Sequence, residues 1–306
     1  MSSLSGDAAT TQAVRPAAVA TGGSVPRAGD RGARIRRTIA YVLIVGYALL
    51  MFVPFLWSVS TSFKTQAQSD ELNLIPTPVS TLGYERAFTE LDPGLPRLFL
   101  NSVVIATAAT ISNVVLGAMA GYAFARLRFP GREVLFILVL GTMMIPDQLR
   151  LVPIYQILRT FGLLKGPLQF VGVWLVLAIS AASIFLFRQY FMSIPKALEE
   201  AAKIDGAGFF TTFARVVLPL ATPAIAAVAI LQFQGAWNGF FWPNVILQQR
   251  DNWTLPLGLS QFQDLYNTQW PPLMAVVVLA TLPILVLYVF FQRYFVEGIA
   301  AAGVKG

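Results

Sequence analysis

The sequence predicts an all-α integral membrane protein with six membrane-spanning helices. Hydrophobic residues make up 56% of its 306 residues and charged residues only 12%, whereas soluble globular chains have about 25% charged residues. The apolar residues gather in long uncharged runs, most of them as long as the roughly 20 residues that cross a bilayer core. Lysine and arginine gather at the ends of these runs, as is typical of membrane topology.

The predicted elements begin with a tail. Residues 1–37 are rich in small residues and arginine, lack periodicity, and are predicted to form a disordered basic cytoplasmic tail. The next apolar run is longer than the h-region of a signal peptide and no clear cleavage site follows it, so we expect a span rather than a cleaved leader. One transmembrane domain is predicted over residues 38–306. Its spans are 38–63, 98–125, 133–158, 166–188, 216–243 and 268–293.

The third predicted span is the weakest of the six. Between Glu133 and Asp147 only residues 134–146 are uncharged, although the apolar character resumes at 151–158. The charge distribution favours this span nevertheless. With both termini in the cytoplasm, six spans leave 15 of the 22 lysines and arginines on the cytoplasmic side and seven outside. Without the third span, the basic segment 188–215 would lie outside.

The composition excludes several classes of function. The sequence has no cysteine and no histidine, which removes disulfides, Cys/His metal sites and His-based catalytic triads. It also lacks a G-x-x-x-x-G-K-[ST] motif. We therefore expect no catalytic residue, no metal site and no enzyme activity in this chain. Because the net charge of +7 comes from residues at the ends of apolar runs, we expect contact with membrane lipid and no nucleic acid partner.

A charged segment with glycines lies between the fourth and fifth predicted spans. Ser193 and Pro195 suit a helix start, and a short helix is predicted from Lys196 to Asp205. Gly206 suits its C-terminal end in a left-handed conformation, and a second short helix is predicted at about 209–216. Apolar residues would form one side of this pair, while four charged residues would stay in water: Glu199, Glu200, Lys203 and Arg215. The pair is either an amphipathic linker or a surface for another protein.

The stretch "EAAKIDGAGFFTTFARVVLP" resembles the EAA loop of permease subunits in ATP-binding-cassette importers. The family pattern is E-A-A, three residues, Gly, nine residues, Ile, one residue and Leu-Pro, and only Val216 departs from it here. Asp205 and Ala207, on either side of the glycine, resemble the carbohydrate branch, closest to the maltose-type second permease. The resemblance extends over nearly all of the chain after residue 38, with further matching stretches: "PFLWSVSTSFK", "GYAFARLRFPGR", "AWNGFFWPNVIL" and "QRYFVEGIAAAGVKG".

This resemblance implies a type I ABC importer permease fold whose EAA loop, residues 199–219, holds the coupling helix. It implies a coupling surface for the ATPase made of seven residues: Glu200, Ala201, Ala202, Asp205, Gly206, Leu218 and Pro219. The implied partners are an ATPase dimer that binds ATP and magnesium, a second homologous permease and an extracytoplasmic solute-binding protein. This chain would hold no cofactor. The implied location is the bacterial or archaeal inner membrane, with both termini cytoplasmic.

The implied function is ATP-driven import of a sugar or related polyol. Sugars offer hydroxyls and apolar C–H faces, so polar and aromatic side chains inside the bundle are candidates for the substrate pathway. The fifth predicted span has such a segment, which begins at Gln232. We predict Gln234, Trp237, Asn238 and Trp242 for the pathway, and the spacing of the first three places them on one helix face. The alternative is that they belong to an interfacial belt.

Other functions stay open. The substrate could be glycerol phosphate or an amino acid, since only the family-like motifs favour sugar. A stand-alone channel or secondary transporter would need repeats and intramembrane charges, and neither is evident. Asp147, beside Pro146 and Arg150, is expected to have a structural or docking role near the outer edge. The loop from Lys64 to Arg97 could meet a solute-binding protein.

Overall fold

A computed structural model describes residues 29–263 and 267–303. The chain divides into two compact units, residues 1–53 and residues 54–306. Helix α1 (Gly29–Ser62) supplies the described part of the first unit and the start of the second. Of the predicted tail, residues 1–28 lie outside the described residues. Residues 29–37 differ from the prediction because they already belong to α1: arginine and alanine favour helix, so the helix extends beyond the apolar run.

The second unit is built from helices, and no strand occurs in the part of the chain that the structure describes. The longer helices are α4 (Leu95–Arg126), α5 (Arg132–Gly141), α6 (Asp147–Thr160), α7 (Leu168–Leu177), α8 (Ala181–Ser193), α12 (Thr222–Trp237) and α15 (Trp270–Gly303). The shorter α-helices are α2 (Gln66–Ser69), α3 (Leu82–Thr89), α9 (Ala197–Ile204), α10 (Phe209–Thr212), α11 (Leu218–Leu220), α13 (Phe241–Ile246) and α14 (Leu255–Leu259). The remaining turns are η1 (Thr142–Met144), η2 (Phe213–Val217, a π-helix), η3 (Arg250–Asn252) and η4 (Ser260–Phe262).

Among the described residues, three helices are long and apolar enough to cross a membrane: α1, α4 and α15. Three bent helix pairs raise this number to six if each pair counts as one span. The bends are 103° between α5–η1 and α6, 47° between α7 and α8, and 77° between α10–α11 and α12. The predicted third, fourth and fifth spans therefore contain breaks rather than single straight helices.

Prolines explain two of the three breaks. Pro146 precedes α6 directly, and Pro219 and Pro223 flank the break at Ala221. Proline has no N–H to donate and its ring clashes with the preceding turn, so a helix bends or stops there. The break between α7 and α8 has no proline. It is held instead by hydrogen bonds with the side chain of Asn113.

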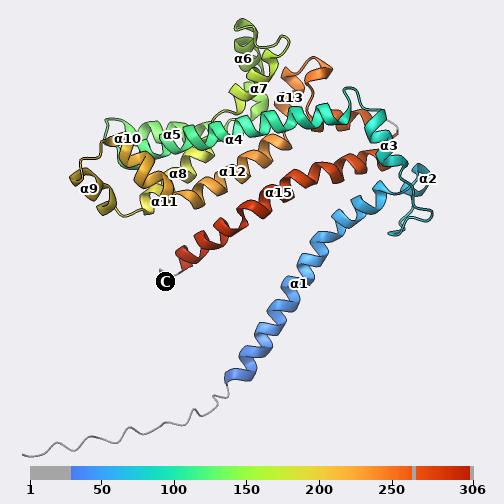
Figure 1. Cartoon of the computed structure of the whole chain (residues 1–306), viewed down its shortest axis with the longest axis horizontal. Coiled ribbons are helices and arrows are strands. Elements are labelled where there is room, and N and C mark those ends of the chain that lie inside the picture. Colours follow the sequence, from blue (N-terminus) through green and yellow to red (C-terminus); the bar gives the residue numbers. More distant parts are fainter. Residues whose placement is uncertain (1–28, 264–266, 304–306) are drawn as a thin grey trace, which may run out of the picture. The chain divides into compact units, whose positions relative to one another are not determined.

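Helix α4 is the centre of the second unit. It packs most extensively against α8 and α12, and α12 packs in turn on α15 (Figure 1). Gly121 permits the contact with α8, because a Cβ atom there would lie 2.6 Å from the Cβ of Phe187 and 2.9 Å from the backbone nitrogen of Arg188. Gly117 faces the same helix. Two small residues four positions apart thus let the backbones of α4 and α8 approach closely.

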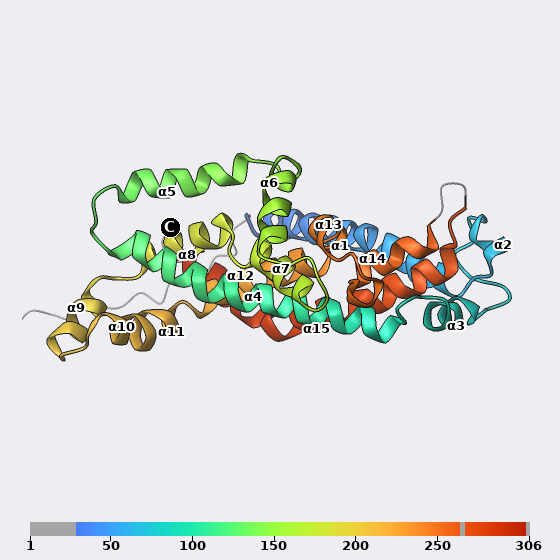
Figure 2. The same cartoon turned by 90° about the horizontal axis from the view of Figure 1, so that it is seen from above.

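The two ends of α4 carry different structures. Helices α9 and α10 lie at its C-terminal end, whereas α3 and α14 lie at its N-terminal end (Figures 1 and 2). At the N-terminal end a cluster of buried apolar side chains joins α4 to α14 and α15; it includes Leu98, Leu255 and Val276. At the C-terminal end a second cluster joins α4 to α8 and α12; it includes Tyr122, Phe187 and Val217. The two clusters hold α4 at both of its ends.

Candidate functional site

The segment after α8 forms two short helices joined by a glycine turn. Helix α9 ends at Ile204, and Gly206 follows with φ +82°. The Gly206 N–H donates to the carbonyl of Lys203 at 3.0 Å, and the Ala207 N–H donates to that of Ala202 at 2.9 Å. These two bonds form a Schellman motif, which satisfies carbonyls at the helix end and favours glycine at the left-handed position. The predicted first helix and its stop at Gly206 are confirmed.

The second half of this loop leads back to α12. Gly208 has φ −73°, an ordinary extended conformation, and α10 begins at the next residue. The helix then widens into the π-turn η2 at Phe213 and continues as α11, with Pro219 in its first turn. The predicted second helix at about 209–216 is thus present, with a π-turn in place of its second half. From here on, loop 199–219 means the residues of that range, which run from the first turn of α9 into α11.

Glu199 fastens α9 to the end of α4. Its side chain was expected to stay in water, but the residue is only 8% exposed, so that prediction is wrong. One carboxylate oxygen lies 2.8 Å from Nε of Arg126, and the other accepts a hydrogen bond of 3.1 Å from the hydroxyl of Tyr122. Both partners come from α4. A buried carboxylate is tolerated when it is paired and hydrogen-bonded in this way.

Arg126 and Tyr122 also contact the end of α8 and the second half of the loop. The Arg126 guanidinium donates to the carbonyl of Phe191 at 2.7 Å and also to that of Ile194. The ring of Tyr122 lies 5.4 Å from the ring of Phe209 and 5.0 Å from that of Phe213. We call Arg126, Tyr122 and Glu199 the anchor. It ties the end of α8 and both helices of loop 199–219 to α4.

The outer side of the loop carries exposed apolar side chains. Ile204 is 87% exposed, Phe210 73% and Leu198 42%, so much of the apolar side predicted for this pair faces outward. Of the predicted coupling residues, Ala202 is buried, Leu218 is half-buried, and five are exposed: Glu200, Ala201, Asp205, Gly206 and Pro219. Exposed apolar groups edged by charges mark contact surfaces. Six of the seven predicted residues are therefore at least partly accessible.

The structure does not bring the four predicted pathway residues together. Gln234 and Asn238 are exposed, whereas Trp237 is only 2% exposed. The Trp237 indole donates to the carbonyl of Ala280 at 3.1 Å, and its ring stacks on Phe233. Trp237 packs against α15, whereas Gln234 and Asn238 stay exposed, so the first three residues do not share one environment.

Trp242 contributes instead to a recess of about 460 Å³ between α4, α6, α7, α8, α12 and α13. We call it the central recess. Its polar lining residues are Thr142, Asp147, Arg150, Ser180 and Gln232. Asp147 and Arg150 form an ion pair with each other. Gln232 donates to the Ser180 hydroxyl at 3.0 Å, and Gly235 and Ala236 leave room beside it in the recess. The sequence prediction chose Gln234 and missed Gln232; the two small residues three and four positions after Gln232 were the signal that could have identified it.

Asn113 of α4 holds the break between α7 and α8. Its carbonyl oxygen accepts from the Ser180 N–H at 2.8 Å and from the Ser183 hydroxyl at 3.1 Å, and its amide donates to the Leu177 carbonyl at 2.6 Å. The Ser180 hydroxyl also caps α8 by accepting from the Ser183 N–H. Backbone groups freed by a break inside a membrane need such partners. We call Asn113, Ser180, Ser183 and Gln232 the amide network; an asparagine in a long uncharged run was its only sequence signal.

The described residues contain no group of three acidic side chains that could hold a metal ion. A family model described as "Binding-protein-dependent transport system inner membrane component" matches residues 113–300. This range contains loop 199–219, the central recess except Ala109, and all of the amide network.

Individual proteins that are similar to this chain are also permease components of transport systems. The arabinooligosaccharides transport system permease protein AraQ of Halalkalibacterium halodurans is 35% identical over 276 residues, which are 88% of this chain and 97% of that protein. The diacetylchitobiose uptake system permease protein NgcG of Streptomyces coelicolor is 34% identical, covering 87% and 88%. The sn-glycerol-3-phosphate transport system permease protein UgpE of Yersinia pestis is 33% identical, covering 84% and 93%.

A solved structure also superposes on the fold. It is a chain of a bacterial ABC transporter involved in the import of the acidic polysaccharide alginate. The TM-score is 0.73 at 25% sequence identity, and the match covers 87% of this chain and 98% of that one. The bent helix pairs of the second unit are therefore compatible with a type I permease fold.

Proposed function

The chain belongs to the family of inner membrane components of binding-protein-dependent transport systems, and from this premise we propose that it is the permease subunit of an ATP-driven sugar importer. The observation that carries the proposal is loop 199–219. Its apolar residues face outward, while the buried carboxylate of Glu199 fastens it to α4. A surface that is exposed on one side and rigidly held on the other suits the transfer of motion from a partner to a span.

In this proposal the partner on the loop is a separate ATPase subunit, present as a dimer, which binds the ATP and magnesium. Ile204 and Phe210 insert into its surface, and Glu200 and Asp205 contact its polar rim. A second homologous permease completes the pathway, and an extracytoplasmic solute-binding protein delivers the solute. Both termini and loop 199–219 face the cytoplasm. The positive-inside distribution of lysine and arginine supports this orientation.

The central recess is the proposed surface for the solute. Ser180 and Gln232 offer neutral hydrogen-bonding groups, and Trp242 offers an aromatic wall, which suits the hydroxyls and C–H faces of a sugar. The charges of Asp147 and Arg150 neutralise each other. The names of two relatives refer to oligosaccharides and favour sugar. A glycerol phosphate importer is the second candidate, because the relative named for that solute is almost equally identical.

Affinity purification in mild detergent tests the assignment. The full chain should recover an ATPase, a second permease and a solute-binding protein, whose ligand then identifies the solute. The variant I204D/F210D should lose most of the ATPase but keep the second permease. The control L72D changes another exposed residue, 91% exposed in the segment between α2 and α3, and should keep both. Purification of the chain as a functional homomer without an ATPase would refute the proposal.

A further inference from the structure

A second recess, of about 810 Å³, lies beside the turn that joins α4 to α5. The turn contains Pro130 and Gly131, the latter at φ +79°. The lining residues come from two distant parts of the sequence: residues 128–134, in this turn and the start of α5, and Lys196, which follows α8. None of them lines the central recess. We call this second recess the turn recess.

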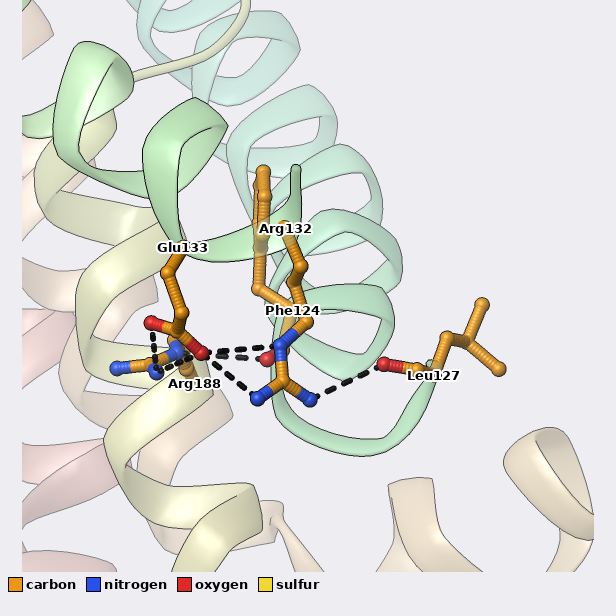
Figure 3. A network of polar contacts seen from close by, with 5 residues as sticks. All are labelled: Phe124, Leu127, Arg132, Glu133 and Arg188. Carbon is orange, nitrogen blue, oxygen red and sulfur yellow. Dashed lines mark hydrogen bonds and ion pairs between the residues drawn. The ribbon is translucent and has the colours of Figure 1, made fainter. Parts of the chain in front are cut away.

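The carboxylate of Glu133 is already neutralised. Figure 3 shows it between two arginines, Arg132 of its own helix and Arg188 of α8. Glu133 lies 2.7 Å from Nη2 of Arg132 and 3.2 Å from Nη2 of Arg188. Arg188 is held further by the ring of Phe136, which lies 4.1 Å from its guanidinium carbon. Glu133 thus has little charge left with which to compensate the other cations of the turn recess.

Two of those cations have no partner. Arg128 and Lys196 are both exposed, and neither forms an ion pair within the described residues. Together with Arg132 they give the lining three positive charges against the single charge of Glu133. The turn recess therefore carries a net positive charge and suits an anion with several oxygen atoms.

An apolar surface begins next to these charges. Val134 is 63% exposed, Ile137 65% and Leu138 62%, all on α5, and α5 belongs to a bent pair that qualifies as a span. A basic pocket beside a lipid-facing helix is the arrangement that binds anionic headgroups. A soluble anion would use the charges but not the apolar surface.

We propose that the turn recess binds the headgroup of an anionic phospholipid. Arg128 and Lys196 contact the phosphate, Arg132 borders it, and the acyl chains lie along Val134, Ile137 and Leu138. Because the phosphate joins Arg128, next to the end of α4, to Lys196, next to the start of α9, the lipid reinforces the position of loop 199–219. This function is separate from the proposed solute import.

Native mass spectrometry of the purified chain with its co-purifying subunits tests the proposal. The probes are phosphatidylglycerol and phosphatidylcholine, each added in mixed micelles. Wild type should retain phosphatidylglycerol preferentially. R128A/K196A should lower that retention by about 30-fold, because each basic residue near an anionic surface contributes about 1 kcal/mol and two are removed. R128K/K196R keeps both charges and should retain the preference.

The control R159A/K165A removes two exposed basic residues, one in the last turn of α6 and one after it, and should leave retention unchanged. Size-exclusion chromatography and thermal unfolding show whether each variant is folded. Equal phosphatidylglycerol retention by folded R128A/K196A and wild type would overturn the proposal. So would displacement of the lipid by millimolar inorganic phosphate, which would identify a soluble anion. Loss of a protein subunit with unchanged lipid retention would assign the turn recess to a protein contact instead.

Discussion

The anchor and the amide network both join α4 to other helices, but they use different chemistry. The anchor, at the last turns of α4, contains an ion pair between Arg126 and Glu199. The amide network, about 20 Å further back along the helix axis, contains only amides and hydroxyls around Asn113. A charge at the bilayer centre is unfavourable by about 2.5–3.5 kcal/mol on insertion scales. Neutral groups therefore hold the broken span, and charges hold the loop near the end of the helix.

Removal of the Glu199 carboxylate should have the largest effect on stability. Glu199→Ala leaves the buried guanidinium of Arg126 without its counter-charge, and breaking a buried pair in this way destabilises by about 3–5 kcal/mol. Thermal unfolding in detergent measures the loss. The control Glu200→Ala changes the neighbouring exposed carboxylate and should shift stability by less than about 0.5 kcal/mol.

The double variant E199M/R126M sharpens this result. Apolar replacement of both members of a buried pair is often neutral, so it should recover much of the stability lost in Glu199→Ala. Equal destabilisation by Glu199→Ala and Glu200→Ala would show that the anchor is not an energetic unit.

Gly121→Ala should have the second largest effect on stability. Gly121 lies on α4 between the anchor and the amide network, where α4 packs closely on α8. Its new Cβ atom would meet Phe187 at 2.6 Å, and forced separation of packed helices costs about 1–3 kcal/mol. The matched control is Gly141→Ala in α5, where a Cβ atom meets nothing within 4 Å. Comparison of the two unfolding midpoints measures the effect. Equal midpoints would mean that α4 and α8 do not pack as closely at Gly121 as the structure shows.

Asn113→Leu should destabilise by about 2 kcal/mol, because it removes three hydrogen bonds to the α7–α8 break, and such bonds average about 0.6 kcal/mol in membranes. The control Thr110→Val loses only a bond within α4, to the carbonyl of Ala106. Thermal unfolding again measures stability, and hydrogen exchange at residues 177–183 should rise in Asn113→Leu. Unchanged exchange there would argue against a bracing role.

Gln232→Leu should have the smallest effect on stability and a clear effect on solute uptake. Gln232 forms a hydrogen bond with Ser180 in the central recess, whereas Gln234 is exposed elsewhere on α12. Uptake by Gln232→Leu should fall several-fold while Gln234→Leu stays near wild type. The reverse order of the two variants would favour Gln234, the residue that the sequence predicted for the pathway.

Local features of the site were predictable from the sequence, and long-range ones were not. The stop of α9 at Gly206 depends on the conformational preference of one residue. The burial of Glu199 depends on Arg126, which is far away in the sequence, and no local pattern distinguishes it from exposed Glu200. Pro146, Pro219 and Pro223 hinted at two of the three bends, and the bend between α7 and α8 had no proline signal. The central recess is lined by helices that are far apart in the sequence, so the sequence indicated Trp242 but not its neighbours.

Coupling through loop 199–219 is tested most directly by the amount of solute imported per ATP hydrolysed in proteoliposomes. Gly206→Val and Gly208→Val form a matched pair, because both positions have open space for a side chain and only Gly206 has a positive φ. The proposed role of the loop predicts that Gly206→Val inserts normally but hydrolyses ATP with little or no import, while Gly208→Val keeps the wild-type ratio. A wild-type ratio in Gly206→Val would contradict it.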